Sequence, residues 1–253
     1  MQKIDINCDM GESTDLWPYQ VENDIALLPF ITSANIACGA HAGDASTMHE
    51  LVDEALLAGV VVGAHPGFED RRNFGRTDMA LPPSKIYDLV ICQLGALDGF
   101  LKINGARLHH VKPHGALYNM SAKDPVMAMA VCQAVKDYDA QLVLYGLANS
   151  ELIKAATTIQ LKACAEVFAD RTYQEDGSLT PRSLPNAMIE SDAQCLQQVL
   201  QIAKYGKVKT VSSKMISVQA GTVCVHSDSV HALSFAKLIH HALQENGIEI
   251  KPV

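Results

Sequence analysis

Short apolar runs alternate with longer segments of helical periodicity along the chain, and this alternation limits the fold more than any other feature. The runs that have the length of strands cover residues 4–8, 31–37, 60–64, 108–111, 142–145, 164–168 and 222–225. Most of them are almost continuously apolar, which is typical of strands covered on both faces. Alternating strands and helices predict parallel strands joined by right-handed crossovers.

The segments between the runs carry recognisable helix ends. We expect a helix from Asp44 or Ser46 to Gly59, and a longer one from Ser84 to Gly105. Asp124 followed by Pro125 predicts a helix that extends to about Tyr138. Further helices are expected from 149–150 onward and over 192–206 and 228–247. Two polar stretches, 70–83 and 171–191, do not fit the alternation, and loops of this length are often functional.

Composition excludes several classes of protein. The chain has 253 residues, a length that one α/β barrel domain covering residues 1–253 accounts for. Its net charge of −8 and lack of a basic run argue against a nucleic-acid partner. No apolar run approaches the roughly 20 residues of a membrane span, and Asp5 and Asp9 interrupt any secretion signal.

The cysteines point to a reducing compartment. There are seven, an odd number, with no C-x-x-C pair. We therefore expect a cytoplasmic protein, in which Cys8, Cys38, Cys164 and Cys224 are buried core thiols.

Polar side chains collect where the predicted strands end. In a parallel barrel these ends open on one mouth, whereas an open doubly wound sheet would bring a ligand to a single switch point. Polar ends on six of the seven strands favour the barrel. The residues concerned are Asn7, Asp9, Glu12, His41, Asp44, His65, Lys112, His114, Tyr118, Asn119, Glu166, Arg171, His226 and Asp228.

Some of these groups have a simpler structural explanation. Asp44 and Asp228 are placed to cap helices. We interpret five other histidines as structural or surface residues: His49, His109, His231, His240 and His241. Three glycines around the histidines permit sharp turns and close approach of the backbone: Gly39, Gly43 and Gly63.

Common catalytic signatures are absent. The sequence has no P-loop, no dinucleotide fingerprint, no nucleophile elbow and no H-E-x-x-H motif. Ser212-Ser213-Lys214 weakly resembles the serine–lysine amidases, but a polar turn is the better interpretation.

Six strings together resemble the LamB/YcsF family, whose members are A subunits of the bacterial 5-oxoprolinase. They are residues 5–13 (DINCDMGES), 33–39 (SANIACG), 41–44 (HAGD), 63–67 (GAHPG), 110–119 (HVKPHGALYN) and 166–171 (EVFADR). The resemblance runs from about residue 2 to residue 248. It departs from the family pattern at Ala40, where Phe is usual, and at Ser227, where Gly is usual.

The resemblance implies a seven-stranded barrel related to the glycoside hydrolases and deacetylases. It also implies ATP-dependent opening of 5-oxoproline to L-glutamate, with Mg²⁺ accompanying the ATP co-substrate, in a complex with partner subunits B and C. Self-association of the chain is left open. Because no P-loop is present, we expect another subunit to hold part of the ATP.

Opening a lactam requires an activated carbonyl, a deprotonated water and stabilisation of the developing charge. The candidates for general base and acid are Asp9, His41, His65 and His114. Lys112 is the candidate for holding phosphate or the substrate carboxylate, assisted by Arg171. The remaining strand-end groups are expected to bind or orient the substrate: Asn7, Glu12, Tyr118, Asn119, Glu166 and His226.

A metal site competes with this interpretation. Asp9, His41 and His65 could ligate a zinc-like ion. Three functions therefore remain open: an ATP-dependent lactamase subunit, a metal-dependent amide or ester hydrolase that needs no ATP, and a non-catalytic subunit that delivers substrate.

Overall fold

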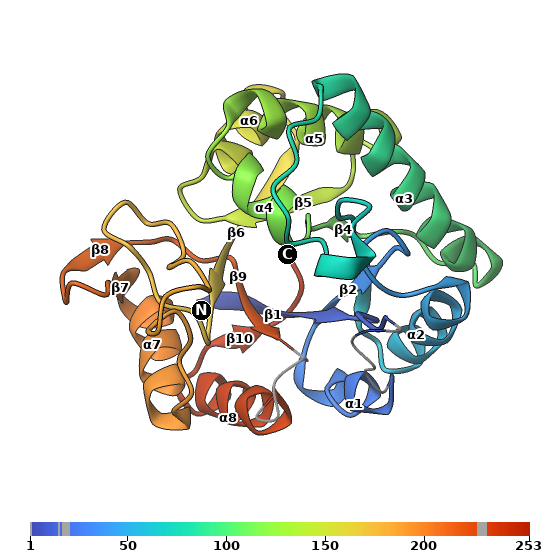
Figure 1. Ribbon diagram of the computed structural model, residues 1–253. Helices are drawn as coiled ribbons and strands as arrows, with labels where there is room; N and C mark the ends of the chain where they lie inside the picture. The colour runs from blue at the N-terminus through green and yellow to red at the C-terminus, as the bar shows by residue number, and fades with distance from the viewer. Residues whose placement is uncertain (1, 15, 17–20, 227–231) are drawn as a thin grey trace.

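Seven parallel strands form a closed barrel in the computed structural model, which describes residues 2–14, 16, 21–226 and 232–253 (Figure 1). The barrel closes because β9 pairs with both β6 and β1. The predicted seven-stranded barrel is therefore confirmed. Its strands are β1 (Lys3–Met10), β2 (Ser33–Ala37), β3 (Val61–His65), β4 (His110–Val111), β5 (Val143–Leu147), β6 (Lys162–Phe168) and β9 (Thr222–His226).

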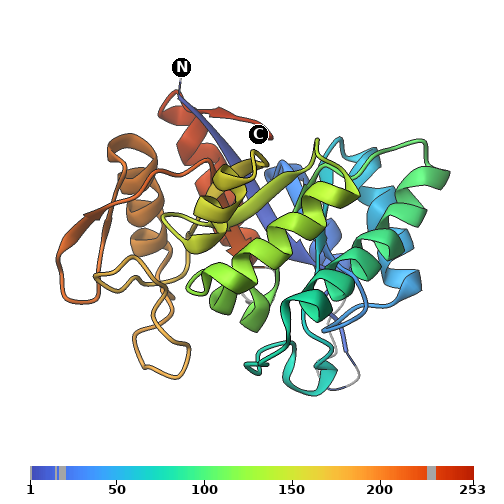
Figure 2. The same cartoon turned by 90° about the horizontal axis from the view of Figure 1, so that it is seen from above.

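The helices cover the outside of the barrel, and α3 and α5 run side by side along one flank (Figures 1 and 2). The predicted caps are present: the Asp44 carboxylate accepts a hydrogen bond from the Thr47 N–H, and Asp124 accepts from Val126 and Met127. The expected start of the last helix at 228 lies outside the described residues. The long helices are α2 (Ala45–Leu57), α3 (Pro83–Ile103), α5 (Pro125–Tyr138), α6 (Glu151–Thr158), α7 (Asp192–Tyr205) and α8 (Ala232–Glu245).

Short elements escaped the sequence analysis because they span too few residues to show a period. One is α4 (Gly115–Ser121), which is separated from the end of β4 by residues 112–114. Another is the antiparallel hairpin of β7 (Lys207–Lys209) and β8 (Met215–Ser217), whose turn contains Ser212–Lys214, as the polar-turn interpretation predicts. The others are α1 (Val21–Ile25), β10 (Glu249–Ile250) and the 3₁₀ turns η1 (Leu28–Phe30) and η2 (Arg71–Asn73).

Residues of β1 alternate between two different environments. Ile6, Cys8 and Met10 pack in the apolar core between barrel and helices. Asp5, Asn7 and Asp9 point into the barrel, where they are buried and hydrogen-bonded. The barrel interior is thus a polar column that leads to the carboxyl ends of the strands, and its groups can be buried because they have partners.

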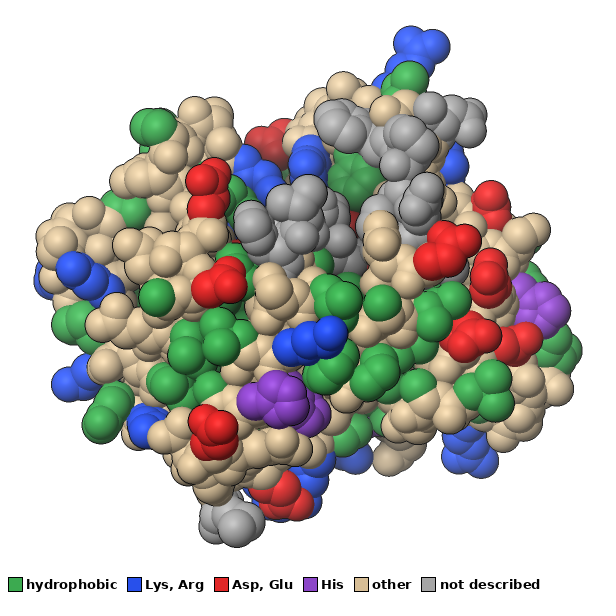
Figure 3. All heavy atoms as spheres, turned by 90° about the horizontal axis from the view of Figure 1, so that it is seen from below, with side chains coloured by type: hydrophobic (Ala, Val, Ile, Leu, Met, Phe, Trp, Pro, Cys, Tyr) green, Lys and Arg blue, Asp and Glu red, His purple; other side chains and the backbone are tan. Residues whose placement is uncertain are grey.

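Both ends of the chain lie at the end of the barrel opposite the carboxyl ends of the strands, where β10 pairs with the start of β1 (Figure 2). Acidic and basic side chains are interspersed over the described part of the face in Figure 3, without a broad basic area. None of the described helices combines the length and hydropathy required to cross a membrane. The four cysteines expected in the core are buried free thiols.

Candidate active site

The carboxyl ends of the strands open on a cavity of about 400 Å³. Its floor contains predicted residues from three strand ends and the segment after β1: Asp9, Glu12, His65, Lys112 and His114. Its outer walls come from the loops after β3 and β5 and from the long segment 171–191, one of the two stretches marked as functional loops. The predicted gathering of strand-end groups at one mouth therefore agrees with the structure.

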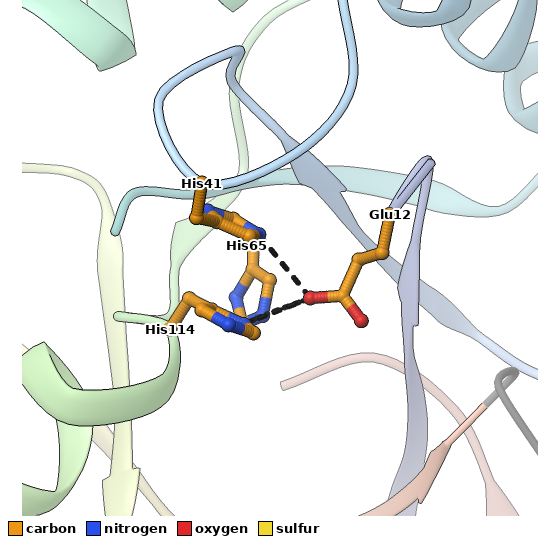
Figure 4. A group of neighbouring side chains, drawn as sticks. All are labelled: Glu12, His41, His65 and His114. Atoms are coloured by element: carbon orange, nitrogen blue, oxygen red, sulfur yellow. Dashed lines mark hydrogen bonds and ion pairs between the residues drawn. The ribbon is translucent and has the colours of Figure 1, made fainter. Parts of the chain in front are cut away.

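Three imidazoles surround the carboxylate of Glu12 (Figure 4). Its Oε1 atom lies 2.8 Å from His114 Nδ1, 3.2 Å from His41 Nε2 and 3.5 Å from His65 Nε2. The ring of His41 stacks on that of His114, with centroids 3.7 Å apart and planes 3° from parallel. These groups converge because Glu12, His41, His65 and His114 follow neighbouring strands β1 to β4.

Hydrogen bonds at the far side of two rings decide which nitrogen faces the cluster. His65 Nδ1 lies 2.7 Å from the Lys112 carbonyl oxygen, and His114 Nε2 lies 2.8 Å from that of Phe74. A carbonyl can only accept, so these nitrogens carry the protons. In the neutral rings, His65 Nε2 and His114 Nδ1, 3.0 Å apart, therefore turn lone pairs toward Glu12.

Acceptor atoms that face one another this closely repel each other unless a proton or a cation lies between them. Burial opposes a charge on His65, but Asp9 and Glu12 raise the pKa of this ring to about 9. Burial and the neighbouring His114 lower the pKa of His41 to about 3. Burial opposes ionisation of Glu12 too, yet the imidazoles hold its pKa well below the usual value.

The same donor set fits a divalent ion such as zinc. Three imidazole nitrogens and one carboxylate oxygen lie within 4.8 Å of one another, and outward N–H bonds to carbonyls are typical of metal-ligating histidines. The grouping differs from the expected set of Asp9, His41 and His65, since Glu12 faces all three rings. Asp9 Oδ2 lies 3.4 Å from His65 Nε2.

Lys112 occupies a second cluster beside the first. Its Nζ atom lies 2.8 Å from Asp9 Oδ1, 2.7 Å from Glu166 Oε1 and 3.1 Å from Asn7 Oδ1. Burial disfavours the charge, but Asp9 and Glu166 raise the pKa of Lys112 well above its usual value. Burial also opposes ionisation of Asp9, whereas His65 and Lys112 lower its pKa well below the usual range.

The partners of Lys112 change the role expected for it. An ammonium group has three N–H donors, and Lys112 donates to Asn7 Oδ1, Asp9 Oδ1 and Cys224 Sγ, while Glu166 Oε1 forms an ion pair with it. Lys112 is 2% exposed. The structure therefore assigns it to neutralising and positioning Asp9 and Glu166 rather than to binding a substrate anion, as the sequence alone had led us to expect.

The other predicted residues occupy different layers of the site. The Tyr118 hydroxyl donates to Glu166 Oε2 at 2.7 Å, and Asn119 donates to the Gly115 carbonyl at the cavity wall. Arg171 lines the cavity and donates to the Thr180 carbonyl at 2.7 Å. His226 pairs with Asp9 through the backbone of β9, but its side chain, like Ser227 and Asp228, lies outside the described residues.

One polar residue in the barrel was missed because its partners are distant in the sequence. Asn35 Nδ2 donates to Asn7 Oδ1 at 2.7 Å and to Asp9 Oδ1 at 2.8 Å, and its Oδ1 lies 2.6 Å from His110 Nε2. It connects the polar column to Asp9. Its position within an apolar strand was the only available signal.

Glycines make room for the histidines, and we expect Gly67→Ala to reduce activity. A Cβ atom at position 67 would lie 2.6 Å from His41 Nδ1, so the ring would have to leave its stack on His114. Turnover and bound metal can be measured against Gly95→Ala, where an added Cβ meets no atom within 4 Å. Equal values for the two variants would contradict the tight fit around His41.

Comparison with known proteins decides the family. The model of the LamB/YcsF family matches residues 4–253. The chain belongs to the LamB/YcsF family. Relatives named as the A subunit of 5-oxoprolinase include one from Bordetella parapertussis, 56% identical over 98% of both chains. Another, from Bacillus subtilis, is 51% identical over 100% of this chain and 98% of its own.

Solved structures agree with this membership. A lactam utilization protein from Thermus thermophilus is 38% identical, with a TM-score of 0.92 over 100% of both chains. A family 4 carbohydrate esterase from Streptomyces lividans, 12% identical, has a TM-score of 0.53 and covers 98% of this chain and 91% of its own. The second likeness concerns the fold alone.

Proposed function

We propose that this chain is the lactam-hydrolysing A subunit of a 5-oxoprolinase, which opens 5-oxoproline to L-glutamate with ATP as co-substrate and with subunits B and C as partners. The names of its relatives suggest the substrate and the complex. The observation that carries the proposal is the pairing of the Glu12–imidazole cluster with the Asp9–Lys112 ion pair on the floor of one cavity.

Amide hydrolysis divides the tasks among these residues. A lactam carbonyl placed above the cluster develops negative charge when water adds, and the protonated ring of His65 can stabilise that charge or protonate the leaving nitrogen. Asp9 and Glu12 keep the proton on His65. Glu12 and His114 offer the acceptor atoms for the proton of the attacking water.

ATP would activate the amide by transferring its γ-phosphoryl group to the carbonyl oxygen with release of ADP, which makes the carbonyl carbon easier to attack. Water would then add to that carbon, the C–N bond would break as the ring nitrogen takes up a proton, and a second water would release phosphate from the resulting acyl phosphate. Subunits B and C are proposed to hold most of the nucleotide, since this sequence has no P-loop.

A metal-dependent hydrolase is the second candidate, favoured by the convergence of three imidazoles on Glu12. Glu12, His41, His65 and His114 would hold the ion. It would supply Lewis-acid activation of the amide carbonyl. Loading would displace the proton from His65, since a metal competes with protons for imidazole nitrogen.

Reconstitution distinguishes these candidates. Glutamate release is measured for the purified chain alone and with B and C, each with and without ATP and Mg²⁺, after the metal content has been determined. We expect negligible turnover by the chain alone and coupled ATP hydrolysis in the complex. Rapid turnover without ATP by a metal-loaded chain would replace the proposal with the second candidate.

A further inference from the structure

An anionic substrate needs a cationic partner, and Lys112 is committed elsewhere. Its N–H groups donate to Asn7, Asp9 and Cys224, and Glu166 pairs with its charge. The chain as a whole carries a net charge of −8, so its overall field repels anions. A substrate carboxylate or phosphoryl group must therefore be met by other side chains of the same cavity.

The outer half of the cavity supplies such side chains. Four cationic residues line it, namely Arg76, Lys123, Arg171 and Arg182, against the two carboxylates of Asp78 and Asp176. Arg171 is buried and ties the loop through the Thr180 carbonyl. Arg171, Arg76 and Arg182 line the same cavity, and burial and the neighbouring charge of Arg182 lower the pKa of Arg171 to about 10.

Ser150 adds a neutral donor to the lining of the same cavity. It is the N-cap of α6, is 7% exposed and lines the cavity. Its hydroxyl makes no capping bond to the helix and has no partner among the described residues. The Glu151 N–H donates to the Ala122 carbonyl, which fixes the start of α6 beside Lys123. A buried hydroxyl of this kind is costly unless a ligand completes it.

The cavity also has more room than one lactam ring requires. Its volume of about 400 Å³ lies in the range of pockets that hold drug-sized ligands. A five-membered lactam bound at the Glu12–imidazole cluster would leave the outer half for a further group.

We propose that Arg76, Lys123, Ser150 and Arg182 form an oxyanion subsite in the outer half of the cavity, which holds the carboxylate or a phosphoryl group of the substrate. The inference rests on the proposed function for the identity of that substrate. Arginine suits this role because its guanidinium matches the oxygens of both groups.

Calorimetric titration of the whole chain tests the subsite. The ligands are 5-oxoproline, inorganic phosphate and 2-pyrrolidinone, which has the same ring as 5-oxoproline but no carboxylate. The variants are Arg182→Met and Ser150→Ala. Arg107→Met is the matched control, because exposed Arg107 precedes β4 at the opposite end of the barrel. Thermal unfolding verifies that each variant is folded.

If the subsite holds a carboxylate, Arg182→Met should weaken 5-oxoproline binding at least about tenfold and leave 2-pyrrolidinone binding unchanged. Phosphate should then compete with 5-oxoproline. If the subsite holds a phosphoryl group, Arg182→Met should weaken the binding of phosphate only, by the same factor. Phosphate and 5-oxoproline should then bind at the same time. Affinities equal to those of Arg107→Met, or no binding of either anion to the unaltered chain, would overturn the subsite. Phosphate binding that depends on Arg182 in a complex that does not turn over 5-oxoproline would refute the proposed function and leave the subsite standing.

Discussion

Replacing Lys112 with methionine is expected to destabilise the folded chain by about 3–5 kcal/mol, a large part of the stability of a typical domain. The substitution keeps an apolar side chain of similar length but leaves Asp9 and Glu166 buried without their shared cation. Urea unfolding followed by circular dichroism measures the loss. This expectation differs from that of the sequence, which made Lys112 the candidate for holding phosphate or the substrate carboxylate.

Two further variants make the Lys112 experiment specific. Lys85→Met removes an exposed lysine of α3 and should change the free energy of unfolding by less than about 0.5 kcal/mol. Adding Glu166→Gln to Lys112→Met removes one of the buried carboxylate charges that have lost Lys112 and should restore part of the stability. A single Lys112→Met variant as stable as Lys85→Met would show that the ion-pair cluster does not support the fold.

Asp9→Asn is expected to lower turnover by the reconstituted complex about 10²–10⁴-fold. The substitution is nearly isosteric, and its remaining oxygen can still accept from Asn35. It removes one of the two carboxylates that hold the proton on His65. The rate of glutamate release is measured after size-exclusion chromatography has verified assembly with subunits B and C.

Asp88→Asn, an exposed position on α3, is the control for the charge change and should leave turnover unaltered. An Asp9→Asn complex that assembles and works at the normal rate would contradict a catalytic role. The chain would then be the non-catalytic delivery subunit that the sequence analysis left open.

The fold was predictable because its strands and long helices carry strong local signals. The continuous apolar runs and the caps at Asp44 and Asp124 correspond to the observed elements. α4 and the β7–β8 hairpin were missed because tertiary contacts, rather than a repeating pattern, stabilise elements this short. Asp5, Asn7 and Asn35 interrupt these apolar runs, but the sequence alone could not show that their side chains pair inside the barrel.

The site was predictable as a location but not as a set of contacts. Parallel topology brings strand ends together, so Asp9, His65 and Lys112 could be placed at one mouth from their positions in the sequence. Which carboxylate faces the imidazoles depends on side-chain geometry, and Glu12 rather than Asp9 takes that place. Arg76, Lys123 and Arg182 come from irregular segments, where no period relates position to direction.

The backbone connects the loops around the Glu12–imidazole cluster before any ligand arrives. The Ala116 N–H donates to the Gly75 carbonyl, and the His114 N–H donates to that of Pro66, so segments after β3 and β4 are joined directly. A Cβ atom on Gly115 would lie 2.5 Å from the Gly75 oxygen, which excludes larger residues from this junction. This side of the mouth is therefore preorganised, and substrate binding there loses little conformational entropy. Partner subunits would then act on a rigid receptor, contributing delivery of an activated substrate rather than assembly of the reacting groups.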